Sequence, residues 1–260
     1  MHRLVHRLSC LALCLTLAGA GTRTLAGVPG KEDPKKEAPK KSSPADRPVD
    51  PALQKVLDRF DQVQTGVRSL SADFTQSTTN PLLRESQAAS GRLYMRKPES
   101  VSWEYSKPES MRFVIDEGKY TGYFPGRKKA ERRDVHRWTE QIFRFFAVGQ
   151  VSGELRQFYD ITLADAGADM KGSVLLVLDP TKRRVKKRVE SVRLWVDGST
   201  YLPAKVEYVN THGATRTIVF HNVQLNPDLS ASLFNVQIPK DFTVTNGFTE
   251  PGSVSTPTAR

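Results

Sequence analysis

The sequence predicts a mainly β domain of the α+β class, in which helices cover the inner face of one strongly curved antiparallel sheet. Segments in which apolar and polar residues alternate recur from about residue 70 to residue 244. Turn signals such as Lys97-Pro98 and Asp197-Gly198 separate these segments at short intervals, which favours hairpin connections. One segment with helical periodicity precedes the sheet and another interrupts it.

Residues 1–26 have the pattern of a secretory signal peptide. Arg3 and Arg7 give a positive start, and residues 8–20 form an apolar run that small residues follow. A run of this length is shorter than the roughly 20 residues that cross a bilayer. We expect cleavage after Ala20 or Ala26 and export to the periplasm, although an uncleaved anchor remains an alternative.

The composition limits the chemistry and the partners available to the mature chain. Both cysteines, Cys10 and Cys14, lie in the signal segment, so the exported chain has neither disulfides nor thiol chemistry. The net charge is +11, and three arginines of the signal segment account for part of it. A basic chain suits anionic surfaces or acidic partners, and export argues against nucleic acid.

Three segments follow the signal peptide. Residues 27–50 are rich in proline and lysine and poor in large apolar residues, so we expect a disordered spacer. Residues 51–245 are long enough for one domain with a core of ordinary size. The polar residues 246–260 are expected to form a disordered tail.

The domain is expected to open with a helix. Asp50 is a candidate cap and Pro51 suits the first turn. The apolar residues at helical spacing are Leu53, Val56, Leu57, Phe60, Val63 and Val67.

Strands are expected wherever the period is two. They are predicted at 70–79, 87–96, 100–106, 111–116, 119–124, 173–179, 189–197, 203–210, 214–225 and 236–244. Residues 174–178 are apolar on both faces, which predicts a central strand covered on both sides.

The middle of the chain breaks this pattern. From Thr139 onward, Ile142, Phe145 and Phe146 form a helical stripe with Phe143 beside it, and a second short helix is expected over 153–159. A sheet of this length must curl or close. We therefore expect the short helices to form a lid over the concave face.

One broad apolar face is the candidate binding surface. Its predicted members, by alternation, are Leu93, Met95, Val101, Trp103, Tyr105, Phe113 and Ile115, with Ile142, Phe143, Phe145 and Phe146 facing them from the lid. Soft and aromatic side chains make a tolerant wall for apolar ligands that vary in shape. The alternative is an ordinary core that packs entirely against its own helices.

No catalytic, metal or cofactor motif stands out. The histidines lack metal-site spacing, and the sequence contains no G-x-S-x-G, P-loop or G-x-G-x-x-G pattern. We therefore expect a protein that is not an enzyme and needs no cofactor. Two basic segments, 126–137 and 181–188, are either solvated loop tips or docking sites for an acidic partner or an anionic membrane.

Four stretches together resemble a known family. Residues 53–76, with "ADFTQ", are followed by 91–109, "GRLYMRKPESVSWEYSKPE", then 191–210 and 218–244. Their order and spacing are similar to those of the periplasmic outer-membrane lipoprotein carriers, the LolA family. The resemblance implies an incomplete, strongly curved antiparallel barrel, lidded by helices, whose concave face holds the acyl chains of a lipoprotein.

The resemblance also implies partners and a gate. Such a carrier, expected to be monomeric, is loaded by an inner-membrane ABC lipoprotein-releasing transporter and unloads to an outer-membrane receptor or to the membrane itself. The family pattern G-x-L-x-x-x-R-P-x-x-x-x-W maps onto Gly91, Leu93, Pro98 and Trp103, and its arginine corresponds to Lys97. Lysine lacks the planar fork of arginine, so closure of the lid is expected to differ.

Alternation predicts that Lys97 points inward and that Arg96 points to the opposite face. Two other functions remain open on this fold. One is a regulatory module that senses lipids or lipoproteins, and the other is a carrier of a different lipid.

Overall fold

The computed structural model describes residues 49–81, 83–136 and 150–249, all within one unit that spans residues 42–260. Helix α1 (Pro51–Thr65) begins where the sequence predicts it. Asp50 Oδ1 accepts the backbone N–H groups of Ala52 and Leu53 at 2.8 and 3.3 Å, which satisfies two donors that have no partner inside the helix. The buried side chains of α1 are Leu53, Leu57, Phe60 and Gln64.

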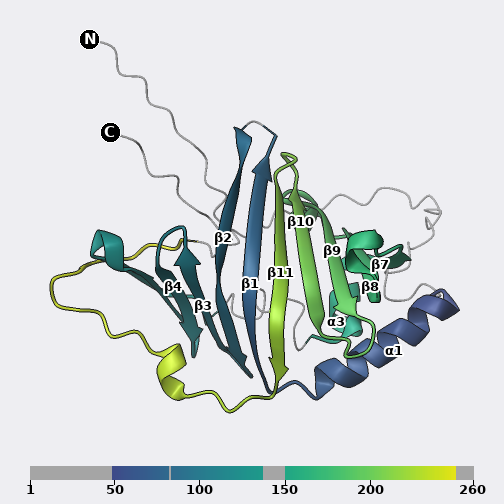
Figure 1. Cartoon of the computed structure of the whole chain (residues 1–260), viewed down its shortest axis with the longest axis horizontal. Coiled ribbons are helices and arrows are strands. Elements are labelled where there is room, and N and C mark those ends of the chain that lie inside the picture. Colours follow the sequence, from purple (N-terminus) through teal and green to yellow (C-terminus); the bar gives the residue numbers. More distant parts are fainter. Residues whose placement is uncertain (1–48, 82, 137–149, 250–260) are drawn as a thin grey trace, which may run out of the picture. The chain divides into compact units, whose positions relative to one another are not determined.

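The described residues form one sheet of twelve strands in the order β12-β6-β5-β4-β3-β2-β1-β11-β10-β9-β8-β7 (Figure 1). The strands are β1 (Ser69–Asn80), β2 (Leu83–Arg96), β3 (Ser100–Lys107), β4 (Met111–Asp116), β5 (Lys119–Phe124), β6 (Lys129–Asp134), β7 (Tyr159–Ala164), β8 (Ser173–Pro180), β9 (Val189–Asp197), β10 (Pro203–Asn210), β11 (Thr215–Leu225) and β12 (Thr243–Thr245). Short connections join most sequential neighbours, as the turn signals predict.

The sheet is antiparallel throughout, except that β12 pairs in parallel with β6. Strand β1 pairs with both β2 and β11, which brings the first and the last long strands together in its middle. In the described part of the chain the terminal strands β12 and β7 do not pair with each other, so the sheet remains open. This is the incomplete antiparallel barrel that the sequence predicts.

Breaks in register bend the strands. The pairing shifts between Ser71 and Asp73 on β1 and between Ser90 and Gly91 on β2. Such bulges increase the local bend and twist of a strand. Both lie near the middle of the sheet, where bending curves one face inward.

Short helices lie in the connections. They are η2 (Pro125–Arg127), α3 (Ser152–Arg156), η4 (Ala168–Met170), α4 (Arg183–Lys186) and η5 (Ala231–Phe234). None of the helices in the described residues is long and apolar enough to cross a membrane. Helix α3 stands where the second short helix was expected, although it ends three residues earlier.

Two strands were not predicted. Strand β6 lies inside the basic segment 126–137. Its period-two pattern is not visible in the sequence because charged residues, Lys129, Glu131 and Arg133, occupy the inward face. Strand β7 follows α3 closely, and only its first residue, Tyr159, lies within the expected helix 153–159; the alternation at Ile161 and Leu163 was not predicted as a strand.

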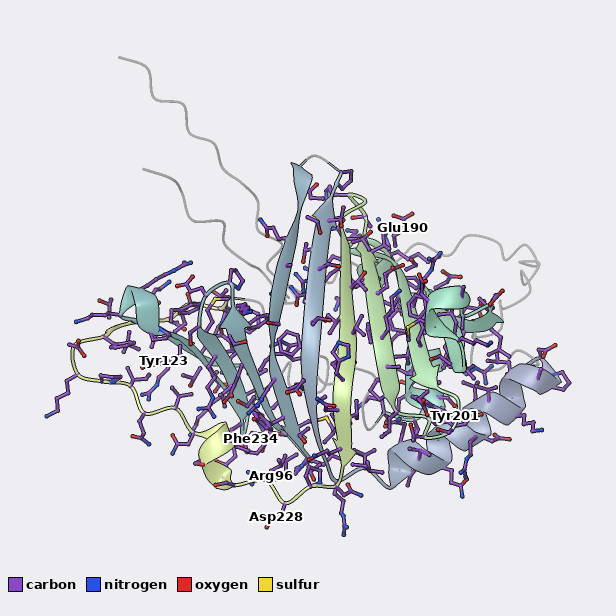
Figure 2. The ribbon with its side chains drawn as sticks, viewed as in Figure 1. Arg96, Tyr123, Glu190, Tyr201, Asp228 and Phe234 are labelled. Carbon is purple, nitrogen blue, oxygen red and sulfur yellow. The ribbon has the colours of Figure 1, made fainter. Side chains whose placement is uncertain are left out.

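The last predicted strand, 236–244, is wrong except at its end, where β12 begins at Thr243. The preceding residues cross the outer face of the sheet as an irregular segment. There Arg112 donates hydrogen bonds to the carbonyls of Ser232 and Leu233, and the Arg96 guanidinium lies 4.5 Å from the centre of the Phe234 ring (Figure 2). Within the predicted strand, Phe242 stacks on Tyr123 of β5 at 5.1 Å between ring centroids, so its partial burial requires no strand pairing.

The expectation of a central strand at 174–178 also needs correction. Strand β8 stands next to the edge strand β7, yet Leu175 and Leu176 are both buried on opposite faces. Its outer face is covered because the β7–β8 connection lies against the neighbouring strand, where Trp195 Nε1 donates to the carbonyl of Ala166 at 2.9 Å. Burial on both faces therefore does not require a central position.

Candidate functional site

The inner face of the sheet is the side that shares one buried cluster with α1. Its side chains align across neighbouring strands because the pairing register keeps equal positions opposite each other. One row contains Leu70, Met95, Val101, Ile115 and Tyr120, and the next contains Ala72, Leu93, Trp103, Phe113 and Gly122. Six of the seven sheet residues predicted for this face lie in these two rows, and the seventh, Tyr105, lies in the adjacent row with Phe74, Gly91 and Met111.

Aromatic rings form the centre of this face. The Trp103 ring lies 5.0 Å from Phe74 and 6.5 Å from Tyr105 between centroids. Phe113 meets Tyr105 edge to face at 5.9 Å and continues to Phe124 at 5.7 Å. Tilted and edge-to-face arrangements are favourable for aromatic rings and give an irregular apolar surface.

Gly91 allows the cluster to form. It stands between Phe74 and Tyr105 in the strand register, and these two rings meet across it at 5.1 Å. A Cβ atom at this position would lie 1.8 Å from the backbone oxygen of Glu104. The glycine is therefore required by the close approach of β2 and β3.

One polar pair lies within the apolar wall. The Tyr105 hydroxyl donates to Gln76 Oε1 at 3.1 Å, and both side chains are buried. A buried hydroxyl without a partner is costly, so the pair lets tyrosine contribute its ring to the wall.

The inner face is packed in this structure. Trp103, Leu93, Met95 and Phe113 are each 2% exposed. A cavity of about 740 Å³ opens instead toward the opposite face, where Asp73, Arg92, Glu104, Arg112 and His221 are among its lining residues. An apolar ligand can therefore reach the inner face only by displacing the groups that bury these side chains.

The predicted lid residues Ile142, Phe143, Phe145 and Phe146 lie outside the described residues. The segments that flank them are held in place. Before them, the Val135 N–H donates to the carbonyl of Gly118 at 2.7 Å. After them, the N–H and hydroxyl of Ser152 donate to the two carboxylate oxygens of Asp61 at 2.6 and 2.7 Å, which ties α3 to α1.

Lys97 lies just beyond the end of β2 and reaches toward α1. Strand β2 ends at Arg96, so the alternation does not extend to Lys97, which is exposed. Its Nζ lies 3.5 Å from the backbone carbonyl oxygen of Gln64 in α1. Arg96 does point to the outer face, as expected, where it packs on Phe234.

A second group of packed side chains, around Tyr120 at the β5–β6 end of the inner face, has no signal in the sequence. Tyr120 donates to the carbonyl of Thr249 at 2.8 Å, and the Phe248 ring lies 4.6 Å from the Tyr120 ring. Burial raises the pKa of Tyr120, and the neighbouring Glu131 carboxylate raises that pKa further. Phe248 and Thr249 belong to the expected tail 246–260, yet they pack against the core.

Buried charge lies beside this group. Glu131 is 4% exposed, and its Oε1 pairs with Lys129 Nζ at 2.8 Å. A buried carboxylate of this kind needs its cation, since removing one partner leaves an uncompensated charge. The aromatic inner face is therefore bounded by polar groups at this end.

The fold and its inner face define a curved, open antiparallel sheet whose concave side is apolar and aromatic. The model of the outer membrane lipoprotein carrier protein LolA matches residues 65–237. The chain therefore belongs to the LolA family, whose carriers are periplasmic lipoprotein-binding proteins.

Individual relatives are distant. The outer-membrane lipoprotein carrier protein of Bordetella avium is 27% identical over 66% of this chain and 78% of its own length. That of Pseudomonas fluorescens is 25% identical over 73% of this chain and 87% of its own length. The crystal structure of a LolA superfamily protein from Nitrosomonas europaea covers 70% of this chain and 97% of its own, with 13% identity and a TM-score of 0.37.

Proposed function

We propose that this protein carries lipoproteins from the inner to the outer membrane by holding their acyl chains against the inner face of its sheet. The observation that carries the proposal is the pair of aligned apolar rows on β1–β5, with aromatic rings at their centre. Acyl chains need only an apolar wall and exclusion of water, and each buried CH₂ contributes about 0.8 kcal/mol. Family membership supports a lipoprotein as the cargo.

The wall residues in this proposal are the seven that the sequence predicts and the structure aligns. Phe74, Phe124 and Met111 extend the same surface and were not predicted as part of it. The Met111 thioether and the varied ring angles suit chains of differing length.

Lys97 is proposed to influence opening from outside the wall. Its ammonium contacts the last turn of α1, whose side chains Leu57 and Phe60 belong to the buried cluster. A single hydrogen bond of this kind contributes roughly 0.5–1.5 kcal/mol, which is weak enough to break and reform as cargo arrives.

The proposed partners follow from the carrier role. An inner-membrane ABC lipoprotein-releasing transporter would load the protein, and an outer-membrane receptor or the membrane itself would receive the cargo. Delivery of the carrier to the periplasm is proposed to use residues 1–26 as a cleaved signal peptide. N-terminal sequencing of the periplasmic protein should read a start near residue 21 or 27, and an intact Met1 would contradict cleavage.

Native mass spectrometry tests the proposed cargo. Protein extracted from the periplasm should carry bound lipoprotein or acyl lipid, and Trp103→Glu should lose it; because the ring is buried, the comparison is made at a temperature at which the far-ultraviolet spectrum of the variant is still that of a folded protein. A charge at the centre of the wall disfavours an apolar chain strongly. Wild-type protein that is free of lipid after gentle extraction, even when the cellular transporter is active, would contradict the proposal.

A further inference from the structure

The two basic segments that the sequence analysis identifies differ in how their charges are paired. In the segment 126–137, three cations have carboxylate partners. Arg127 pairs with Glu109 at 2.7 Å, Lys128 pairs with Asp241 at 2.8 Å and Lys129 pairs with Glu131 at 2.8 Å. Much of the charge in this segment is therefore neutralised within the protein.

The segment 181–188 is different. It contains the helical turn α4 and the exposed cations Lys182, Arg183, Arg184, Lys186 and Lys187. Within the described residues, none of these five side chains forms an ion pair. We call this group of five the basic turn. The nearest acidic residues along the chain, Asp179 and Glu190, are fewer than the cations and are themselves exposed.

The basic turn has a fixed backbone. Lys186 N–H donates to the carbonyl of Lys182 at 3.0 Å, and Val185 is the half-buried residue that turns inward. The neighbouring β10–β11 hairpin holds its end, since Tyr208 Oη and the Thr211 N–H both donate to the carbonyl of Arg188. The backbone that carries the cations is therefore preformed and need not be ordered on binding.

The basic turn also has a defined place in the fold. It joins the ends of β8 and β9 that lie away from α1, whereas the β9–β10 connection at the other end accepts a hydrogen bond from Gln64 of α1 at Tyr201. Figure 2 shows Glu190 and Tyr201 at these opposite ends. The contact between Lys97 and α1 is thus at the far end from the basic turn.

We propose that the basic turn docks the protein on an anionic bilayer, with phospholipid phosphate groups as its ligands. Clusters of lysine and arginine of this size are attracted to anionic lipid surfaces. Protein interfaces, by contrast, are depleted of lysine at their centre and need apolar anchors. The basic turn offers no exposed apolar side chain, so a diffuse phosphate surface matches it better than a protein does.

This inference deepens the proposed function, because a carrier that delivers to or collects from a membrane benefits from a weak and reversible contact. The expected contribution is about fivefold in partitioning per cation near the surface. Replacement of four cations should therefore weaken binding on the order of a hundredfold or more at low salt, and the effect should shrink as the Debye length falls below about 10 Å.

Co-sedimentation with vesicles tests the inference, using the full chain without cargo. The vesicles contain phosphatidylglycerol and phosphatidylcholine in equal parts, or phosphatidylcholine alone. The turn variant carries Lys182→Gln, Arg183→Gln, Arg184→Gln and Lys186→Gln, which keep good helix formers in α4. The control variant carries Arg92→Gln, Arg127→Gln, Lys128→Gln and Arg193→Gln, which make the same change in net charge at ion-paired positions.

Wild type and control should bind the anionic vesicles, the turn variant should lose that binding, and none should bind phosphatidylcholine alone. The lysines of the spacer 27–50 are present in all three proteins and cannot explain a difference between them. Equal binding by the turn and control variants would overturn the inference, as would binding of the turn to acidic polypeptide but not to vesicles. Binding of a fluorescent fatty acid by the wild-type protein is measured separately. If the wild-type protein binds none, the carrier function is contradicted, whereas the docking inference is not.

Discussion

Truncation of Trp103 distinguishes a binding wall from an ordinary core. Trp103→Ala removes a ring that is 2% exposed and that packs 5.0 Å from Phe74. Removal of a buried tryptophan costs about 3–5 kcal/mol, and for a domain of this size each kcal/mol lowers Tm by roughly 2–4 °C. We expect Tm to fall by about 6–20 °C in the absence of lipid.

Lipid should recover part of this loss. If an acyl chain enters the space left by the ring, four buried CH₂ groups return about 3 kcal/mol. Differential scanning fluorimetry with and without a long-chain fatty acid should therefore show a larger lipid-induced rise in Tm for Trp103→Ala than for wild type.

Trp195→Ala is the matched control. This ring is 5% exposed but lies on the opposite face, where Nε1 bonds to Ala166 and the Lys205 ammonium lies 4.2 Å from the ring centre. It should lose comparable stability and gain no extra response to lipid. Equal responses of the two variants would refute the assignment of the inner face as the binding wall. If Trp103→Ala fails to fold, Trp103→Phe makes the same comparison with a smaller void.

Three further predictions concern single contacts. Lys97→Leu should leave fatty-acid uptake unchanged and slow transfer to acceptor membranes, because apolar packing against α1 replaces a weak hydrogen bond; unchanged transfer would limit Lys97 to a structural role. Asp61→Ala should cost about 1–3 kcal/mol and increase hydrogen exchange at 150–156, whereas Asp58→Ala, which loses a bond to Gln54 on the exposed face, should not; similar exchange in both would contradict the tie between α1 and α3. Hydrogen bonds from Ser199 and Thr200 lower the pKa of Asp197 from 3.8 to about 2. Asp197→Ala should therefore be less stable than wild type above pH 3.8, and this difference in urea midpoint should disappear as the pH falls through about 2. A difference in midpoint that does not depend on pH would contradict this prediction.

The helix and most strands were predictable because local signals and tertiary packing agree. Asp50 and Pro51 mark the start of α1 in sequence and in structure. The alternation at Leu93, Trp103 and Phe113 survives because each strand buries the same face against the cluster. These elements could be predicted without knowing which distant residues they contact.

The errors arose where the local pattern depended on a distant partner. Strand β6 carries Lys129 and Glu131 on its inner face, and the sequence cannot show that they neutralise each other there. Phe242 stacks on Tyr123 of β5 at 5.1 Å between ring centroids without joining the sheet, so the alternation at 236–244 predicted a strand of which only the end forms.

The sequence predicted which residues lie on the candidate face, but not that their side chains are packed and buried. Alternation identified the wall, but it could not tell that the wall is packed or that Phe248 closes its β5–β6 end. Alternation also could not show that Lys97 stays exposed, because strand β2 ends one residue before it and a period of two carries no information beyond the strand.

Photo-crosslinking tests the central claim most directly. A diacylated lipopeptide with a diazirine in each acyl chain is bound to the purified protein, irradiated and mapped by peptide mass spectrometry. The carrier account predicts adducts on the inner face, at Leu93, Trp103 and Phe113, and competition by unlabelled lipopeptide. Adducts confined to the outer cavity lined by Asp73, Arg92 and Arg112 would contradict it.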